Sequence, residues 1–427
     1  MTETIFALAT AAGKSGVAII RISGPAATTV ERVIRGKLPS VRSAKLRTLV
    51  DGTEIIDQAV VLNFEGPQSF TGEDMVELHC HGSVAVIAKL YQVLGERCGF
   101  RVARAGEFTR RALENGRLDL TQVEGLADLI DAETEAQRRQ AQRVMDGELG
   151  RLTATWRKEL VTASALIAAT IDFAEEEIPT DVTIEVREAI ERVRADIDRQ
   201  QQGIPAAERI RKGFEVAIVG ETNVGKSTLI NYIAGRDVVI TSRIAGTTRD
   251  VIEVQIDLGG LPVTLLDTAG ERETEDEIEQ VGIERARARA KTSHLRVILT
   301  EDQERVEKPN GDDIVVLAKA DIRENRVGAV SGKTGEGVEE LLNRIQEALK
   351  AKSQTVTVAT RERHSTALRQ ALLALENATE RLAAGPEHYD LVAEELRISI
   401  RALEVFVGIV DVEELLDQIF AKFCVGK

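Results

Sequence analysis

One segment constrains this chain more than any other: residues 220–227, with the sequence Gly-Glu-Thr-Asn-Val-Gly-Lys-Ser. It follows an apolar run at 216–219 that is typical of a buried strand, and it precedes 228–233, which has the composition of a helix start. A Gly-x-x-x-x-Gly-Lys-Ser loop in this setting cradles phosphates, because its backbone N–H groups and the helix dipole point at one place. We therefore expect Lys226 to reach the β- and γ-phosphates of a nucleotide and Ser227 to bind Mg²⁺. The competing interpretation, a glycine-rich turn with a chance lysine, does not account for the flanking strand and helix.

The size and charge of the chain narrow its class. A length of 427 residues suggests about two to four domains. The net charge of −15 disfavours a general nucleic-acid coat, so any RNA contact must come from local basic faces. Three cysteines without paired ligand spacing, no basic N-terminal region and no apolar run near 18 residues lead us to expect a cytoplasmic protein without a signal peptide or a membrane span.

Four stretches of the chain differ in pattern. Residues 1–117 mix strand and helix signals, 118–211 and 352–427 carry apolar residues at helical spacing, and 212–351 alternates strands with helices. This predicts a multidomain α/β and α protein. A P-loop domain with a parallel sheet and helices on both faces is inserted into one discontinuous helical bundle, because two open amphipathic sets of helices need partners. The helices are expected to pause near Gly203-Ile-Pro.

Individual elements follow from the same patterns. We predict strands in the first stretch at 16–22 and 59–64 and a helix at 84–94; in the P-loop stretch we predict strands at 214–219, 262–266, 295–299 and 314–318, and a helix over 337–349. His79 and His81 would share a strand face on either side of Cys80. A metal site there is disfavoured, because no other Cys or His cluster supplies further ligands.

Three further motifs follow the phosphate loop. Asp267-Thr-Ala-Gly270 comes after a predicted strand, where the acid can bind Mg²⁺ through water and Gly270 can meet the γ-phosphate. Gly246-Thr-Thr-Arg-Asp lies before it, where a threonine can ligate Mg²⁺ only when the γ-phosphate is present. Asp321, in Ala-Lys-Ala-Asp, can accept hydrogen bonds from N1–H and the 2-amino group of guanine, and Ser331-Gly-Lys333 would complete the base pocket. Together these motifs indicate a GTPase.

In these and other motifs the chain resembles the MnmE (TrmE) family of bacterial tRNA-modification GTPases. The likeness is carried by Gly16–Pro25, Ser69–Gly82, Arg104-Ala-Gly-Glu-Phe-Thr, Leu118-Asp-Leu-Thr-Gln, Gly-Thr-Thr-Arg-Asp and the terminal Phe423-Cys-Val-Gly-Lys427. It implies a Ras-like G domain inserted into the helical domain. The nucleotide-binding positions it implies are Asn223, Val224, Gly225, Lys226, Ser227, Thr228, Ser242, Arg243, Ile244, Ala245, Gly246, Thr247, Thr248, Asp267, Thr268, Ala269, Gly270, Lys319, Asp321, Ser331, Gly332 and Lys333.

The resemblance also implies the metals and the catalytic groups of GTP hydrolysis. Mg²⁺ would be held by Ser227 and Thr248, and K⁺ by Asn223, Ser242, Ile244 and Thr247. A monovalent cation beside the phosphates can stabilise developing charge as an arginine finger does. Glu271 stands where a glutamine is usual, and the water-orienting acid of the family matches Glu279.

Two positions depart from the pattern of the family. Ala318 replaces the usual asparagine before Lys319, which removes amide hydrogen bonds worth roughly 1–3 kcal/mol. We expect weaker nucleotide binding with guanine selectivity kept by Asp321. Gly332 replaces an alanine, and because it retains the backbone N–H we expect that change to be mild.

The resemblance also implies roles for the flanking domains. The N-terminal domain would dimerise and bind a 5,10-methylene- or 5-formyl-tetrahydrofolate through Arg21, Glu77, Arg117 and Lys427. Cys424 would take part in the modification. With an FAD-binding partner, MnmG (GidA), in a heterotetramer, the chain would form the aminomethyl or carboxymethylaminomethyl group at C5 of uridine 34 of certain tRNAs.

Two questions stay open at this stage. Arginines near the first domain boundary are candidates for tRNA contact, although helical arginines are commonly paired with glutamates; they are Arg104, Arg110, Arg111, Arg138, Arg139 and Arg143. The alternative function is a regulatory GTP-binding switch, such as a ribosome-assembly GTPase, without a modifying role.

Overall fold

The computed structural model describes residues 3–172, 182–236, 240, 253–267, 288–306, 311–353, 357–409, 419–420, 423 and 426. The chain forms two compact units: Met1–Ala127 with Val407–Lys427, and Asp128–Phe406. Within the described part of the chain, no helix combines the length and the apolar composition that crossing a bilayer requires.

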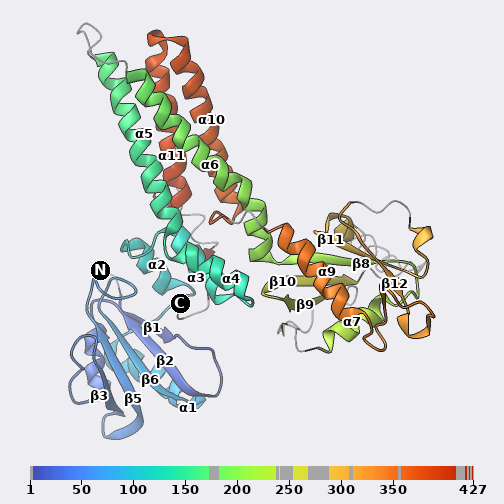
Figure 1. Ribbon diagram of the computed structural model, residues 1–427. Helices are drawn as coiled ribbons and strands as arrows, with labels where there is room; N and C mark the ends of the chain where they lie inside the picture. The colour runs from blue at the N-terminus through green and yellow to red at the C-terminus, as the bar shows by residue number, and fades with distance from the viewer. Residues whose placement is uncertain are drawn as a thin grey trace, which may run out of the picture. The chain divides into compact units, whose positions relative to one another are not determined.

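The first unit is built on a seven-stranded sheet in the order β3-β4-β5-β6-β2-β1-β7 (Figure 1). Its strands are β1 Ile5–Leu8, β2 Ser15–Ser23, β3 Ile34–Arg35, β4 Ala44–Asp51, β5 Glu54–Phe64, β6 Met75–Gly82 and β7 Arg101–Val102, with the 3₁₀ helix η1 at Ala27–Val33. All pairs are antiparallel except β1 with β7. Along β2 the residues Ala18, Ile20 and Ile22 are fully buried, as strand alternation requires of a one-sided core.

Helices complete the first unit. They are α1 Val84–Cys98, α2 Glu107–Glu114 and the first part of α3, Leu120–Ile130. Helix α1 ends at Gly99, whose left-handed conformation (φ 70°) favours glycine. Phe420 and Phe423, near the end of the chain, pack with Leu120 and Val123 of α3. The carboxyl-terminal residues therefore belong to the same unit as the N-terminal sheet.

The second unit contains a bundle of long helices (Figure 1). They are α4 Glu135–Met145, α5 Glu148–Asp172, α6 Val182–Lys212, α10 Glu362–Ala384 and α11 Tyr389–Val407, with η4 at Pro386–His388 before α11. Trp156 and Leu160 of α5 and Ile190 and Val193 of α6 are buried. Arg194 of α6 pairs with Glu376 of α10, and Arg157 of α5 pairs with Glu404 of α11, so helices far apart in the sequence belong to one bundle.

Helix α6 corrects one expectation from the sequence. The predicted pause near Gly203-Ile-Pro is wrong, because α6 continues through Pro205 to Lys212. A proline removes one helical hydrogen bond. Burial of the neighbouring Ile204, Ala206 and Ala207 offsets that loss.

The second sheet has six strands in the order β13-β12-β11-β8-β10-β9. They are β8 Phe214–Val219, β9 Glu253–Leu258, β10 Leu261–Asp267, β11 Leu295–Thr300, β12 Ile314–Ala318 and β13 Ala329–Val330, with helices α7 Lys226–Ala234 and α9 Val338–Ala351 and the 3₁₀ helices η2 Gln303–Arg305 and η3 Ala320–Ile322. β8, β12 and β11 lie within one residue of their predicted bounds.

The expectation of a wholly parallel sheet is wrong at its edge. β9, which the sequence analysis missed, pairs antiparallel with β10. The alternation of Val254, Ile256 and Leu258 before Gly259-Gly260 is the hairpin signal that could have revealed it. An antiparallel strand at the edge of an otherwise parallel sheet is common, and here the Gly259-Gly260 turn joins it to β10.

Candidate nucleotide-binding site

The phosphate loop joins β8 to α7 as the sequence predicts. Gly220 has φ 154°, and a Cβ there would lie 2.1 Å from the Leu299 carbonyl oxygen, so the turn requires glycine. Asn223 (φ 60°) and Gly225 (φ 109°) are left-handed. Alternation of such conformations turns successive N–H groups toward one point, which makes an anion-binding concavity.

Lys226 is the first residue of α7 and is nearly buried, with 5% of its surface exposed. Its Nζ donates to the carbonyl oxygens of Gly220 (2.8 Å) and Glu221 (2.9 Å). The ammonium is therefore held directly over the loop, where phosphate oxygens of a bound nucleotide would meet it.

A cation site is formed where β8 and β10 end side by side. Ser227 Oγ donates to Asp267 Oδ2 at 2.5 Å. Asp267 is buried, and its Oδ1 has no hydrogen-bond partner among the described residues. A buried carboxylate oxygen without a donor is costly, and a hydroxyl beside a carboxylate is the donor set that Mg²⁺ takes in P-loop proteins. These residues therefore fit a divalent cation.

The base pocket is preorganised around Asp321. Ser331 Oγ donates to Asp321 Oδ1 at 2.7 Å, and the backbone N–H of Lys333 donates in turn to Ser331 Oγ at 3.2 Å. The hydrogen bond from Ser331 lowers the pKa of the Asp321 carboxyl below its ordinary value. An ionised carboxylate can accept hydrogen bonds from N1–H and the 2-amino group, which suits guanine.

The structure changes the interpretation of Gly332. A Cβ at this position would lie 2.5 Å from Leu229 N and 2.6 Å from the carbonyl carbon of Thr228, both in the first turn of α7. The expectation that Gly332 is a mild departure from the family rested on the retained backbone N–H alone, and the structure adds this steric constraint. The base loop packs directly on the helix that carries the phosphate loop, and an alanine has no room in this backbone arrangement.

The remaining predicted positions divide by location. Val224 is buried in the core of the sheet, and Thr228, Lys319 and Lys333 lie on the described loops and helix at the carboxyl ends of β8, β12 and β13. The other positions fall outside the described residues: Ser242, Arg243, Ile244, Ala245, Gly246, Thr247, Thr248, Thr268, Ala269, Gly270, Glu279, Cys424 and Lys427.

The first unit holds a second polar cluster. Arg21 Nε donates to Glu77 Oε1 at 2.9 Å, and His79 Nε2 lies 3.2 Å from Glu77 Oε2. The Arg21 guanidinium lies 5.1 Å from the centroid of the Phe70 ring and 5.8 Å from that of Phe108. Arg21 and Glu77, which were predicted for this site, thus lie on the neighbouring strands β2 and β6. They contact three residues that the sequence analysis did not assign to it: His79, Phe70 and Phe108.

His79 and the two aromatic rings were missed for a physical reason. Register pairs β2 with β6, and only that register places Arg21 opposite Glu77. His79 was weighed as a metal ligand, but its ring contacts Glu77, whereas His81 contacts Asp57 at 2.7 Å. Among the described residues no group of three or more His, Cys, Asp or Glu is arranged to hold a metal.

The end of the chain approaches the same sheet. A Cβ on Gly426 would lie 2.0 Å from the carbonyl oxygen of Leu8, so the tail backbone packs on β1. Ala7, the residue before Leu8, is the register partner of Arg21. Arg117 is exposed, and its Cγ lies 3.2 Å from where a Cβ on Gly72 would stand.

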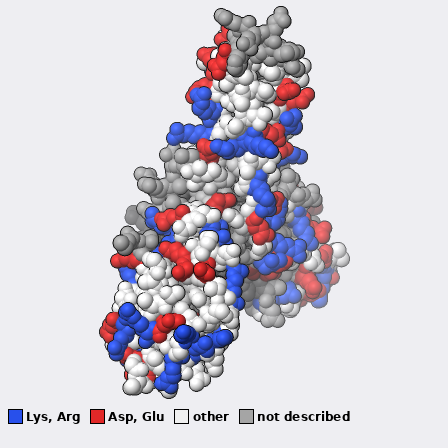
Figure 2. Space-filling model, turned by 90° about the vertical axis from the view of Figure 1, so that its left-hand side faces the viewer, with Lys and Arg blue, Asp and Glu red and all other residues white. Residues whose placement is uncertain are grey.

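The arginines proposed for tRNA contact are mostly ion-paired. Arg111 is buried rather than on the surface, because it neutralises the carboxylates of Glu73 (2.9 Å) and Glu107 (3.1 Å). Four others form ion pairs on their own helices or with the next helix: Arg110 with Glu114, Arg138 and Arg139 with Glu135, and Arg143 with Glu148. Figure 2 shows Lys and Arg interspersed with Asp and Glu on the face drawn, so no single basic surface marks an RNA site there.

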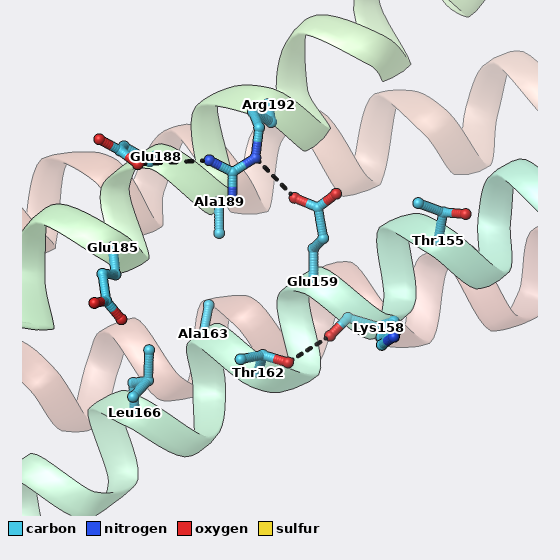
Figure 3. Close-up of a pocket in the computed structure, with 10 residues that line it drawn as sticks. All are labelled: Thr155, Lys158, Glu159, Thr162, Ala163, Leu166, Glu185, Glu188, Ala189 and Arg192. Carbon is cyan, nitrogen blue, oxygen red and sulfur yellow. Dashed lines mark hydrogen bonds and ion pairs between the residues drawn. The ribbon is translucent and has the colours of Figure 1, made fainter.

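A groove with a volume of about 490 Å³ lies between α5 and α6 of the bundle (Figure 3). Ala163 and Ala189 lie on its two sides, and Arg192 crosses it to Glu159 (3.1 Å) while contacting Glu188 (3.6 Å). Arg192 thus pairs with two of the carboxylates that line the groove, and Lys158 and Glu185 line it as well.

The phosphate loop, the Ser227–Asp267 pair and the Asp321–Ser331 pair together define a P-loop GTPase. Family models match residues 4–117 as the GTP-binding protein TrmE N-terminus and residues 120–424 as the MnmE helical domain. The chain is 55% identical over 428 residues to the tRNA modification GTPase MnmE of Roseobacter denitrificans and 56% identical to that of Ruegeria pomeroyi, with all of each chain covered. The chain belongs to the MnmE family of tRNA modification GTPases.

Among solved structures, Era in complex with MgGDPNP and nucleotides of 16S ribosomal RNA matches 32% of this chain and 56% of its own. That match has 25% identity and a TM-score of 0.26. A likeness at this level carries no conclusion about fold, and the family assignment rests on the full-length relatives.

Proposed function

We propose that this GTPase uses GTP hydrolysis to drive formation of an aminomethyl or carboxymethylaminomethyl group at C5 of uridine 34 of tRNA. GTP binding is supported by the Ser227–Asp267 pair, since Asp267 Oδ1 is buried beside the phosphate loop and has no partner among the residues that the structure describes, and tRNA as the substrate is supported by the full-length relatives. The ribosome-assembly alternative is not retained, because the full-length relatives are tRNA modification GTPases.

The described residues support a mechanism of positioning and charge neutralisation. Loop N–H groups and Lys226 hold the β- and γ-phosphates, and Asp321 selects guanine. Ser227 and Asp267 would hold Mg²⁺, which would supply neutralisation of the charge on the phosphate oxygens. We further propose Glu279 as the residue that orients the attacking water and Thr248 as a second Mg²⁺ ligand, both from the family resemblance.

A potassium requirement is proposed from Asn223. Its left-handed backbone places it on the rim of the loop, where it is exposed. With Ser242, Ile244 and Thr247 it would hold K⁺ beside the phosphates, which stabilises charge that develops in the transition state. GTP turnover should be faster in K⁺ than in Na⁺, and Asn223→Ala should abolish the difference. Asn231→Ala, an exposed asparagine on α7, is the matched control; equal rates in the two salts would refute the requirement.

A folate derivative is proposed for the polar cluster of the first unit. Glu77 can accept from pterin N–H groups, whereas Arg21, Arg117 and Lys427 can pair with carboxylates of the glutamate tail. Packing of Gly426 beside β1 supports a contribution from the chain end, including Cys424.

The folate proposal is tested by calorimetric titration of the full chain with 5-formyl-tetrahydrofolate. Glu77→Gln should weaken binding at least tenfold, since it removes charge-assisted hydrogen bonds. Asp57→Asn, which changes the neighbouring pair with His81, should not. Equal loss in both variants, or no binding by the parent, would remove folate from the account.

The assembly is proposed on the same family basis. The chain would form a homodimer through its N-terminal domain and a heterotetramer with the FAD-binding MnmG (GidA), in the cytoplasm, with tRNA as the substrate. The domain bounds 1–117, 118–211, 212–351 and 352–427 remain part of this proposal. Co-purification of an FAD-containing protein, with retention of its flavin absorbance, is the direct check on the partner.

A further inference from the structure

Arg323, the last residue of the loop that carries Asp321, forms hydrogen bonds with the ends of the two strands beside the loop. Arg323 follows the short helix η3, and its guanidinium reaches back over the loop. Nε donates to the carbonyl oxygen of Ala318, and Nη2 donates to the carbonyl oxygen of Glu301. These carbonyls stand at the carboxyl ends of β12 and β11, which are neighbouring parallel strands. One side chain thus joins two strand ends at the nucleotide edge of the sheet.

This loop has a backbone conformation that needs restraint. Lys319 is left-handed, with φ 59°, which costs of order 1 kcal/mol for a residue that is not glycine. Ala318, which precedes it, is buried and has only a methyl group, so its side chain supplies no hydrogen bond. The polar restraint on Lys319 and Asp321 must therefore come from elsewhere.

The described contacts supply that restraint from both ends of the loop. Lys319 Nζ lies 2.5 Å from the Glu301 carboxylate, whose pKa is lowered by this hydrogen bond, and Ser331 holds Asp321. Glu301 is thus engaged through its side chain by Lys319 and through its carbonyl by Arg323. Removing Arg323 would remove the two hydrogen bonds that tie the strand ends to this loop, and would leave the backbone hydrogen bonds of the turn and the side-chain contacts of Lys319 and Ser331.

We propose that Arg323 is the positioning residue of the guanine pocket and takes over the restraint that a polar side chain at position 318 would supply. It does not touch the nucleotide. It fixes the backbone of Lys319, and hence the angle at which the Asp321 carboxylate meets the base. Guanine donates two hydrogen bonds to Asp321, from N1–H and from the 2-amino group, whereas hypoxanthine lacks the 2-amino group. The ratio of the affinities for the two bases therefore reports the position of the carboxylate.

The test compares GDP and IDP affinities of the full-length protein, by displacement of a fluorescent GDP analogue in Mg²⁺ buffer. Arg323→Gln should weaken GDP binding about tenfold, as expected for lost charge-assisted hydrogen bonds, and should lower the GDP-to-IDP preference. Arg296→Gln is the matched control, because Arg296 forms an ion pair with Asp313 at the other end of the same two strands. It should change the melting temperature without changing the preference.

Two further variants complete the test. Arg323→Lys, which can reach one carbonyl but not both, should fall between the parent and Arg323→Gln and remains informative if the glutamine variant does not fold. Ala318→Asn in the Arg323→Gln chain should restore the preference. An unchanged preference in Arg323→Gln, an equal change in Arg296→Gln, or no rescue by Ala318→Asn would overturn the proposal.

Discussion

Replacing Gly332 by alanine tests the close packing of the base loop on α7. The added Cβ would lie 2.5 Å from Leu229 N and 2.6 Å from Leu229 Cα, where real contacts exceed 3 Å. These are backbone atoms of a turn whose Leu229 N–H already donates to the Gly225 carbonyl at 2.9 Å. α7 cannot yield without moving the phosphate loop, so the base loop must shift instead.

Overpacking of this kind costs roughly 1–3 kcal/mol, which corresponds to about a 5- to 150-fold loss where it acts on binding. We expect Gly332→Ala to weaken GDP affinity within that range, as measured by displacement of a fluorescent analogue. Gly311→Ala, at a described glycine with open space around its Cβ position, should bind GDP as the parent does. Parent-like GDP affinity and parent-like urea stability in Gly332→Ala would refute the reasoning.

Three other predictions concern charged groups. Asp321→Asn should move nucleotide preference from guanine toward xanthine, because the amide donates where xanthine carries an oxygen; a preference measured as unchanged would contradict the role of Asp321. Asp267→Asn should raise the Mg²⁺ concentration needed for half-maximal GTP turnover, and an unaltered Mg²⁺ titration would place the cation elsewhere. Burial acts to raise the pKa of Glu107, but hydrogen bonds from Arg101, the Arg104 N–H and Arg111 outweigh it and lower the pKa to about 2. Stability from Glu107 is thus present above its ordinary pKa of 4.5 and lost as pH falls toward 2, so Glu107→Gln should flatten acid unfolding in that window; an identical pH profile would count against it.

Local patterns were sufficient for much of the fold. β8 and β12 begin and end where predicted, because each is a short interior strand of the sheet with no fully exposed residue. The prediction ended a helix near Gly203, whereas α6 continues to Lys212. Proline and glycine propensities carry no information about the burial that keeps this helix continuous. β9 was missed although its residues alternate between apolar and polar before Gly259-Gly260, because the prediction considered only strands that alternate with helices.

The residues of the candidate site likewise include some that the sequence predicts and some that it does not. Lys226, Ser227, Asp267 and Asp321 could be predicted, because their chemistry is set by short motifs after strands. The bracing by Arg323 and the contact of Gly332 with α7 could not, because each depends on backbone positions from segments distant in sequence.

The central claim is most directly tested by mass spectrometry of wobble-uridine nucleosides in tRNA from cells that lack this gene. The account predicts that the C5 aminomethyl and carboxymethylaminomethyl uridines disappear, that the parent gene restores them, and that Lys226→Ala does not. Unchanged amounts of these nucleosides in the deletion strain would contradict it.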